Sequence, residues 1–120
     1  MKLKLHILLV AAMGALVSPA AVSTAYSAPQ KGIASVYSTR EGTRTASGIR
    51  LRDSALTAAH RSLRFGTKVK VTNRKTGKSV IVTITDRGPF VRGRIIDLTP
   101  AGARALGFSG LAPVTLNVMS

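Results

Sequence analysis

The chain has 120 residues, which is enough for one domain. It contains 18 Lys and Arg but only four Asp and Glu, so its formal net charge is +14, and it has no cysteine. The missing cysteine excludes disulfides, a cysteine nucleophile and a lipid anchor attached through cysteine, while the charge predicts salt-dependent binding to polyanions.

The N-terminal segment has the pattern of a secretory signal peptide. Lys2 and Lys4 precede an apolar run at 7–17, and small residues follow it up to Ala28. The run is shorter than the roughly 20 residues that span a bilayer as a helix. We therefore expect a signal peptide at 1–28, cleaved between 20 and 28, with an uncleaved anchor as the less favoured alternative.

Export decides which polyanions the mature protein meets. We expect a short linker at 29–31 and one domain at 32–120, located in the periplasm, in the wall or outside the cell. Removal of Lys2 and Lys4 lowers the net charge from +14 to +12. Wall polymers and lipid headgroups then replace nucleic acid as expected partners, and no RNA-binding aromatic motif is present. Binding driven by charge alone remains a third, weaker interpretation.

The first half of the mature chain predicts one clear strand. Residues 32–38 are rich in β-branched and aromatic residues at alternate positions, as in a strand. Residues 39–49 are polar, contain two glycines and are expected to form a surface loop. Residues 55–60 have the composition of a short helix, but the stretch is too short for the composition to decide between helix and strand.

A β-hairpin is the clearest local prediction. Residues 68–72 alternate polar and apolar side chains, as a half-buried strand does. Residues 73–78 include a glycine and are expected to turn. Residues 79–85 are more continuously apolar, so we expect this strand to be buried on both faces. The hairpin delivers Asp86 at its end.

The last third predicts two strands and one helix. Ile95 and Ile96 continue the β pattern, and residues 114–118 alternate again. Between them, Thr99 is the expected N-cap of a helix that Gly107 ends. Many short strands and one or two short helices in under 100 residues predict a small, mainly β, closed barrel, because closure leaves no exposed edge strands.

Several ordered motifs identify a family. The motifs are GIAS at 32–35, TASG at 45–48, ALTAAH at 55–60, residues 63–66, VKVTN at 69–73, DRGPF at 86–90 and RIIDL at 94–98. In this order they resemble the rare lipoprotein A family over the whole mature chain. The resemblance implies a six-stranded double-psi β-barrel related to those of expansins and some endoglucanases.

The resemblance also implies an activity. It implies that the protein is an endolytic peptidoglycan lytic transglycosylase. Such an enzyme cleaves between N-acetylmuramic acid and N-acetylglucosamine in glycan strands, with a preference for peptide-stripped strands. Cleavage leaves a 1,6-anhydro end and serves wall remodelling and cell separation. By the same resemblance Asp86 is the acid/base, His60 and Asp97 belong to the site, and peptidoglycan glycan strands are the partner.

Each candidate residue also has a simpler structural interpretation. Asp86 precedes Gly-Pro and could cap a turn, Asp97 could stabilise the following helix, and His60 could be a buried structural histidine. Four further residues within the motifs are expected to bind substrate: Thr45, Ser47, Arg87 and Phe90. The hydroxyl groups of Thr45 and Ser47 could instead form only turn contacts.

The chain departs from the family at Ile49, where a glutamate usually follows TASG. Glycosidases ordinarily use two carboxyl groups, but in transglycosylation the sugar's own hydroxyl attacks, so one acid/base residue can suffice. Glu41 is a possible replacement. The alternative is a non-catalytic barrel that binds peptidoglycan or another polysaccharide, or loosens the wall as expansins do.

Other catalytic chemistries have no support in the residues. No serine lies in a G-x-S-x-G context. The mature part has a single histidine and no cluster of metal ligands. We therefore expect no metal site and no cofactor.

Overall fold

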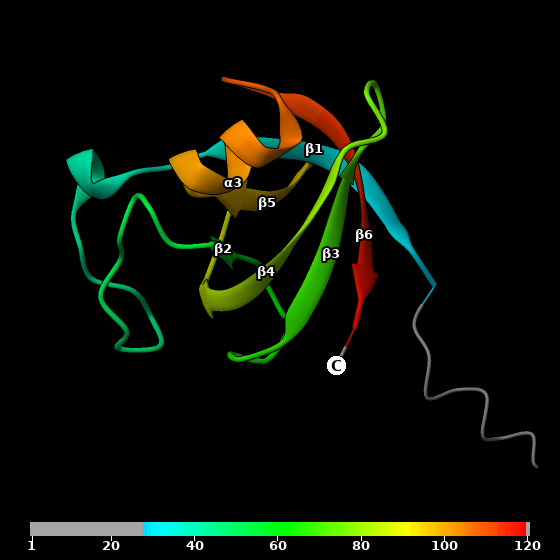
Figure 1. Cartoon of the computed structure of the whole chain (residues 1–120). Coiled ribbons are helices and arrows are strands. Elements are labelled where there is room, and N and C mark those ends of the chain that lie inside the picture. The colour runs from blue at the N-terminus through cyan, green and yellow to red at the C-terminus, as the bar shows by residue number, and fades with distance from the viewer. Residues whose placement is uncertain (1–27, 120) are drawn as a thin grey trace, which may run out of the picture.

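The structure is a computed structural model that describes residues 28–119 (Figure 1). The predicted signal segment and the earlier cleavage positions lie outside these residues, so cleavage and export stay predictions. Within them the elements are, in chain order, β1 (Gln30–Val36), the 3₁₀ turn η3 (Thr39–Glu41), β2 (Thr57–Ala59), β3 (Lys68–Asn73), β4 (Ser79–Asp86), β5 (Arg94–Leu98), α3 (Pro100–Leu106) and β6 (Ala112–Val118).

The six strands close into a barrel in the order β1-β5-β2-β4-β3-β6. The pairs β1–β5 and β2–β4 are parallel, and the other four pairs are antiparallel. The predicted six-stranded β-barrel is therefore confirmed. β1 begins at Gln30, before the predicted strand at Gly32, because Gln30 and Lys31 pair with β6.

The core lies inside the barrel and under the helix. Alternate residues of each long strand point inward, and α3 packs over β4 and β5 (Figure 1). The largest fully buried apolar side chains are Val69, Val71, Val82, Ile84, Ile96, Leu98, Leu106 and Val114. No helix in residues 28–119 has the length and hydropathy needed to cross a membrane.

The helix α3 begins and ends where its sequence predicts. The Thr99 hydroxyl accepts a hydrogen bond from Gly102 N, and Pro100 occupies the first turn. Gly107 ends the helix in the left-handed conformation, with φ of 75°, which glycine adopts without strain. The same Thr99 hydroxyl donates to the Ala55 carbonyl at 2.6 Å, so it also ties α3 to the segment before β2.

The ambiguous stretch at 55–60 contains a strand. Ala58 pairs with Ile84 of β4 on one side and with Leu98 of β5 on the other. β2 therefore completes the barrel between these two strands. Pairing with β4 and β5 outweighs the weak helix propensity of this short stretch, so the stretch forms a strand.

The prediction that residues 79–85 are buried on both faces is wrong for the first part of β4. Val82 and Ile84 are fully buried, but Ile81, which directly precedes Val82, is 50% exposed. Only at the end of the strand, at Ile84 and Thr85, are two consecutive side chains buried. Because the exposed residue Ile81 is itself apolar, the sequence of β4 has the continuous apolar run that is typical of a strand buried on both faces.

The hydroxyl of Thr99 gives a test of the connection between α3 and β2. In Thr99→Val the shape is kept, but the Ala55 carbonyl and the Gly102 amide lose their partner. We expect a loss of about 1–3 kcal/mol in the free energy of unfolding, measured by thermal or denaturant unfolding. Thr99→Ser keeps the hydroxyl and is the matched control; equal stability of the Val variant and the wild type would contradict this role.

Candidate active site

The two predicted carboxyl groups lie in one row across four neighbouring strands. Asp97 of β5 pairs with Ser35 of β1 and with Ala59 of β2, and Ala59 pairs in turn with Asp86 of β4. Neighbouring strands are about 4.8 Å apart, so the Cα atoms of Asp86 and Asp97 are separated by about two strand spacings, roughly 10 Å. The fold therefore brings together the two acids that the motifs singled out.

Asp86 is the last residue of β4 and is held at one oxygen. Its Oδ1 accepts hydrogen bonds from Ala46 N at 2.8 Å and from Arg87 N at 2.9 Å. Ser47 N also donates to the Thr85 carbonyl at 3.2 Å, so the TASG loop is attached to the end of β4. Within residues 28–119 no hydrogen bond reaches the second oxygen, Oδ2, which is available to a substrate.

Asp97 is held differently. Its Oδ1 accepts a hydrogen bond from the Ser35 hydroxyl, and its side chain is partly buried. Burial raises the pKa of Asp97 above its ordinary value, the Ser35 hydrogen bond and the nearby Arg94 act in the opposite direction, and the charges of Glu41 and Asp86 add to the rise. Asp97 therefore keeps its proton to a higher pH than an ordinary aspartic acid, as a general acid must.

The DRGPF loop places an aromatic ring beside Asp97. Gly88 has a φ of 128°, and a side-chain carbon added there would lie 3.8 Å from Asp97 Oδ2 and 3.7 Å from the Phe90 ring. The Phe90 side chain is 76% exposed. An exposed aromatic face next to a carboxyl group is suited to contact a sugar ring. The substrate-binding role of Phe90 stays a prediction.

Arg87 turns its guanidinium toward residues 60–65. Nη1 donates to the carbonyls of Leu63 at 2.8 Å and His60 at 3.3 Å, and the group lies 4.0 Å from the centroid of the Phe65 ring. This side chain therefore fixes the segment after β2 against the end of β4. Its predicted contact with substrate stays a prediction.

The hydroxyl groups of the TASG loop hydrogen-bond within the loop. Thr45 Oγ1 donates to the Ile49 carbonyl and lies 3.1 Å from Ser47 Oγ, which accepts from Ile49 N at 3.2 Å. The loop is thus closed on itself, and the Ile49 side chain is 58% exposed. The substrate-binding roles predicted for Thr45 and Ser47 remain predictions.

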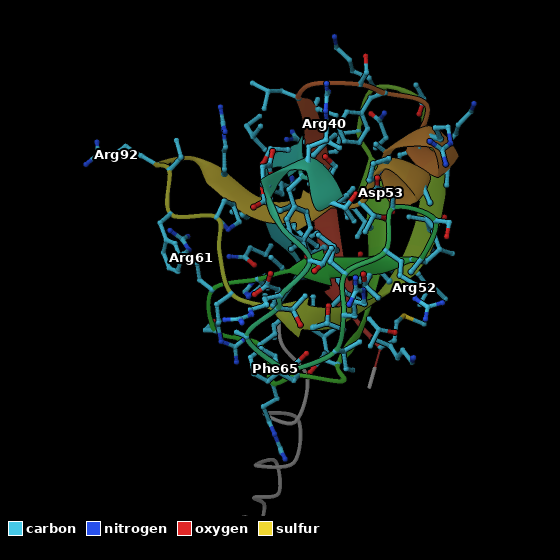
Figure 2. The ribbon with its side chains drawn as sticks, turned by 90° about the vertical axis from the view of Figure 1, so that its left-hand side faces the viewer. Arg40, Arg52, Asp53, Arg61, Phe65 and Arg92 are labelled. Atoms are coloured by element: carbon cyan, nitrogen blue, oxygen red, sulfur yellow. The ribbon has the colours of Figure 1, made fainter. Side chains whose placement is uncertain are left out.

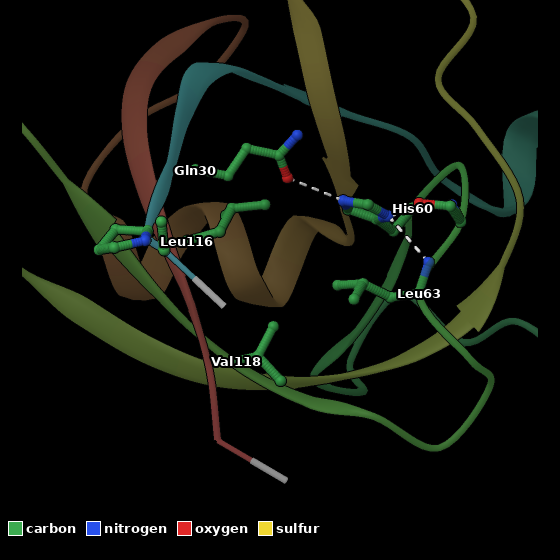
Figure 3. A pocket seen from close by; sticks show the side chains of 8 residues that line it. Gln30, His60, Leu63, Leu116 and Val118 are labelled. Carbon is green, nitrogen blue, oxygen red and sulfur yellow. Dashed lines mark hydrogen bonds between the residues drawn. The ribbon is translucent and has the colours of Figure 1, made fainter. Parts of the chain in front are cut away.

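The His60 ring lines a pocket whose lining residues include neither Asp86 nor Asp97 (Figure 3). Its Nδ1 accepts hydrogen bonds from Ser62 N at 3.1 Å and Leu63 N at 3.2 Å, so Nε2 carries the hydrogen and donates to Gln30 Oε1 at 3.0 Å. The pocket has a volume of about 350 Å³ and is also lined by Leu116 and Val118. The backbone of His60 is joined to Asp86, because His60 N donates to the Asp86 carbonyl at 3.1 Å.

The environment of His60 favours the neutral ring. Burial lowers the pKa of His60, and the positive charges of Arg61 and Arg87 lower it further. Both ring nitrogens are engaged as described, which fits a structural role. Its catalytic role stays a prediction that the geometry does not test.

Ser35 and Asp53 were not assigned to the site from the sequence, and Glu41 was named only as a possible replacement for the missing carboxyl group at position 49. Ser35 belongs to the GIAS motif, but its pairing with Asp97 depends on the barrel register. Glu41 lies in η3, and its charge reaches both Asp97 and Tyr37. Asp53 anchors η3 by accepting from Thr39 N at 2.8 Å and Thr39 Oγ1 at 3.0 Å.

Basic side chains surround the face that carries η3. Figure 2 shows Arg40, Arg52, Arg61 and Arg92 on separate segments around this face, and all four are exposed. They come from η3, from the loops on either side of β2 and from the loop before β5. Such a distribution raises the local concentration of anionic polymers near the face.

The closed six-stranded barrel with its two parallel strand pairs is consistent with a double-psi β-barrel, and one row of it carries two carboxyl groups. The chain belongs to the lytic transglycolase family, whose model matches residues 29–116. The resemblance to the rare lipoprotein A family is confirmed by relatives of known name.

Two relatives illustrate the similarity. A Nostoc protein named "Probable endolytic peptidoglycan transglycosylase RlpA" is 54% identical over 94 residues, covering 74% of this chain and 25% of the relative. An Aquifex aeolicus protein of the same name is 47% identical over 92 residues, covering 74% of this chain and 41% of the relative. The chain thus spans about a quarter of the length of the Nostoc relative.

Two solved structures share the fold. A Clavibacter michiganensis expansin in complex with cellohexaose matches with a TM-score of 0.61 and 24% identity, over 78% of this chain and 51% of the expansin. The Streptomyces papain inhibitor matches with a TM-score of 0.64 and 19% identity, over 79% of this chain and 97% of the inhibitor. At these identities the similarity shows the barrel fold alone.

The lowered pKa of His60 predicts how stability depends on pH. Because the folded protein disfavours the charged ring, the unfolded chain binds the proton more readily, and stability falls as the pH drops through the ordinary histidine pKa of about 6.5. We expect the melting temperature to fall between about pH 7.5 and pH 5.5. His60→Asn retains an acceptor for Ser62 N and Leu63 N but cannot be protonated, so its melting temperature should fall less over this pH range. An identical pH dependence of the melting temperature in both proteins would contradict the prediction.

Proposed function

We propose that this protein is an endolytic peptidoglycan lytic transglycosylase, with Asp86 and Asp97 as its acid/base pair. The observation that carries the proposal is the row in which barrel register places both carboxyl groups. The names of the relatives give the reaction class. The proposed substrate is the glycan strand of peptidoglycan, cleaved between N-acetylmuramic acid and N-acetylglucosamine.

In the first step Asp97 donates a proton to the glycosidic oxygen. Its raised pKa supports this assignment, because a general acid must enter the reaction protonated. Protonation allows the bond between C1 and that oxygen to break, and the leaving sugar departs with the proton. The charged Asp86 carboxylate then faces a sugar that carries developing positive charge at C1.

In the second step the C6 hydroxyl of the same muramic sugar attacks C1. Asp86 takes up the hydroxyl proton through its available oxygen, Oδ2, and the 1,6-anhydro ring closes. No water is consumed, and exchange with solvent restores both acids after release. Sequence motifs alone placed the whole acid/base role on Asp86; the burial of Asp97 supports dividing it between the two.

The surroundings of the pair support a polymer substrate. The exposed Phe90 ring beside Asp97 offers a surface for a sugar face, and the arginines in Figure 2 attract anionic wall polymers. Such a substrate lies outside the cytoplasm, so the proposal includes export by the N-terminal segment to the periplasm or the wall. Peptide-stripped strands are the preferred form in this proposal.

A second candidate is a barrel that binds glycan or loosens the wall without cleavage. Ile49 favours it, because the exposed loop position next to the TASG motif has no carboxyl group. The similarity to an expansin whose structure holds cellohexaose is compatible with it in fold. The two candidates predict the same binding but different products.

Product analysis separates them. The full chain is incubated with peptide-stripped glycan strands, and the products are identified by mass spectrometry. We expect 1,6-anhydro ends, and a fall in rate of about 100-fold or more in Asp97→Asn and in Asp86→Asn, since general acid–base catalysis contributes on that order. Activity should also decline as the pH rises above the pKa of Asp97, because the donor is then ionised.

Lys75→Gln is the control, because Lys75 is exposed in the turn between β3 and β4. It should retain the wild-type rate. Glycan binding by the wild type without any anhydro product would instead establish the second candidate.

The loop position 49 gives an independent prediction. Ile49→Glu adds a carboxyl group to the loop that Ala46 N attaches to Asp86. We expect the rate of anhydro-product formation to rise about tenfold, since a further acid/base group contributes at least that much. In Ile49→Gln the new side chain has nearly the same shape as that of glutamate but no charge, so this variant should have the wild-type rate. Equal rates in the two variants would show that this position takes no part in the chemistry.

A further inference from the structure

The Tyr37 hydroxyl is a buried polar group without a partner. Among the side chains of residues 28–119 it is the one buried oxygen or nitrogen that forms no hydrogen bond. Its backbone is well fixed, because Tyr37 N donates to the Leu98 carbonyl at 2.9 Å and so extends the pairing of β1 with β5. A buried, unpaired hydroxyl on a fixed backbone is unfavourable for folding and therefore needs another explanation.

Tyr37 lies beside the strand that carries Asp97. It comes directly after the end of β1, two residues beyond Ser35, and its N–H continues the pairing of β1 with β5. Residues two apart in an extended chain point to the same side, so the Tyr37 side chain is expected on the side of Ser35, whose hydroxyl donates to Asp97. Burial, and then the charges of Asp86, Asp97 and Glu41, raise the pKa of Tyr37. The hydroxyl thus keeps its proton and stays a hydrogen-bond donor near acids.

Each acid of the pair has one oxygen that lacks a donor. Asp86 Oδ1 accepts from Ala46 N and Arg87 N, and Asp97 Oδ1 accepts from the Ser35 hydroxyl. Within residues 28–119 no side chain or backbone N–H donates to either Oδ2. An unpaired donor therefore lies in the same region as two unpaired acceptor atoms.

We propose that Tyr37 is a positioning residue whose hydroxyl donates a hydrogen bond to the Asp86–Asp97 pair when both acids are ionised. This inference rests on the proposed function, in which Asp97 loses its proton in the first step and leaves two negative charges in one row. Like charges so placed repel each other, and a donor from Tyr37 lowers the free energy of that state. Because the bond forms only as the charge develops, it accelerates the reaction without strengthening substrate binding.

The isosteric variant Tyr37→Phe tests the inference kinetically. We expect kcat for anhydro-product formation to fall about tenfold or more, as for other preorganised donors, with KM changed less than about twofold. The melting temperature should not fall, because the missing hydroxyl has no partner in the folded protein. An unchanged kcat would overturn the inference.

Titration of the carboxyl groups gives a readout that does not depend on activity. Carbon-13 NMR of the full chain follows Asp86 and Asp97 in the wild type and in Tyr37→Phe. Loss of a donor to the doubly ionised pair should raise the pKa of the acid that ionises last. The charges of Glu41 and Arg94, which also act on the pKa of Asp97, are the same in both proteins. The decline of activity at high pH should shift upward with it.

The two proposals can therefore fail separately. A wild-type protein that makes no anhydro product refutes the proposed function, while the titration still decides the role of Tyr37. Identical carboxyl titrations in both proteins refute the role of Tyr37, whatever the products. Ser35→Ala is the positive control for the titration, because it removes the donor to Asp97 Oδ1 and should raise the pKa of Asp97.

Discussion

Two register shifts in the parallel strand pairs determine where the acids lie. In β1–β5 a shift after Ile33 makes Ser35 the partner of Asp97, and in β2–β4 a shift after Ala58 makes Ala59 the partner of Asp86. Without the shift in β2–β4, Ala59 would pair with Thr85, and Asp86 would leave the row by one residue. Without the shift in β1–β5, Asp97 would pair with Val36 in place of Ser35. The shift in β2–β4 therefore aligns the two acids, and the shift in β1–β5 gives Asp97 its serine partner.

The row then gives two chemically identical side chains different environments. Asp86 lies at a strand end where backbone amides of the TASG loop and of Arg87 reach it. Asp97 lies where burial raises its pKa and a serine hydroxyl is its hydrogen-bond donor. Two acids in different environments are the arrangement that separates a proton donor from a proton acceptor. The long connection between β1 and β2 contributes by placing its loop over the end of β4 (Figure 1).

Local patterns predicted those elements whose signals are local. The helix α3 has its cap residues within its own sequence, and the β3–β4 hairpin has alternation and a glycine turn. β2 has three residues and no such signal, since its strand conformation depends on pairing with β4 and β5, which are distant in the chain. The exposure of Ile81 was missed for a related reason, because a continuous apolar run does not show which face of the strand is covered.

The sequence by itself determined the barrel class and the family and singled out the two candidate acids, because motif residues and strand periodicity are properties of short segments. The tertiary structure alone decided that Asp86 and Asp97 share a row, that the His60 ring faces Gln30, and that the Tyr37 hydroxyl lacks a partner. These features depend on the register between strands and on burial. Both arise from contacts between residues far apart in the chain, which no local pattern encodes.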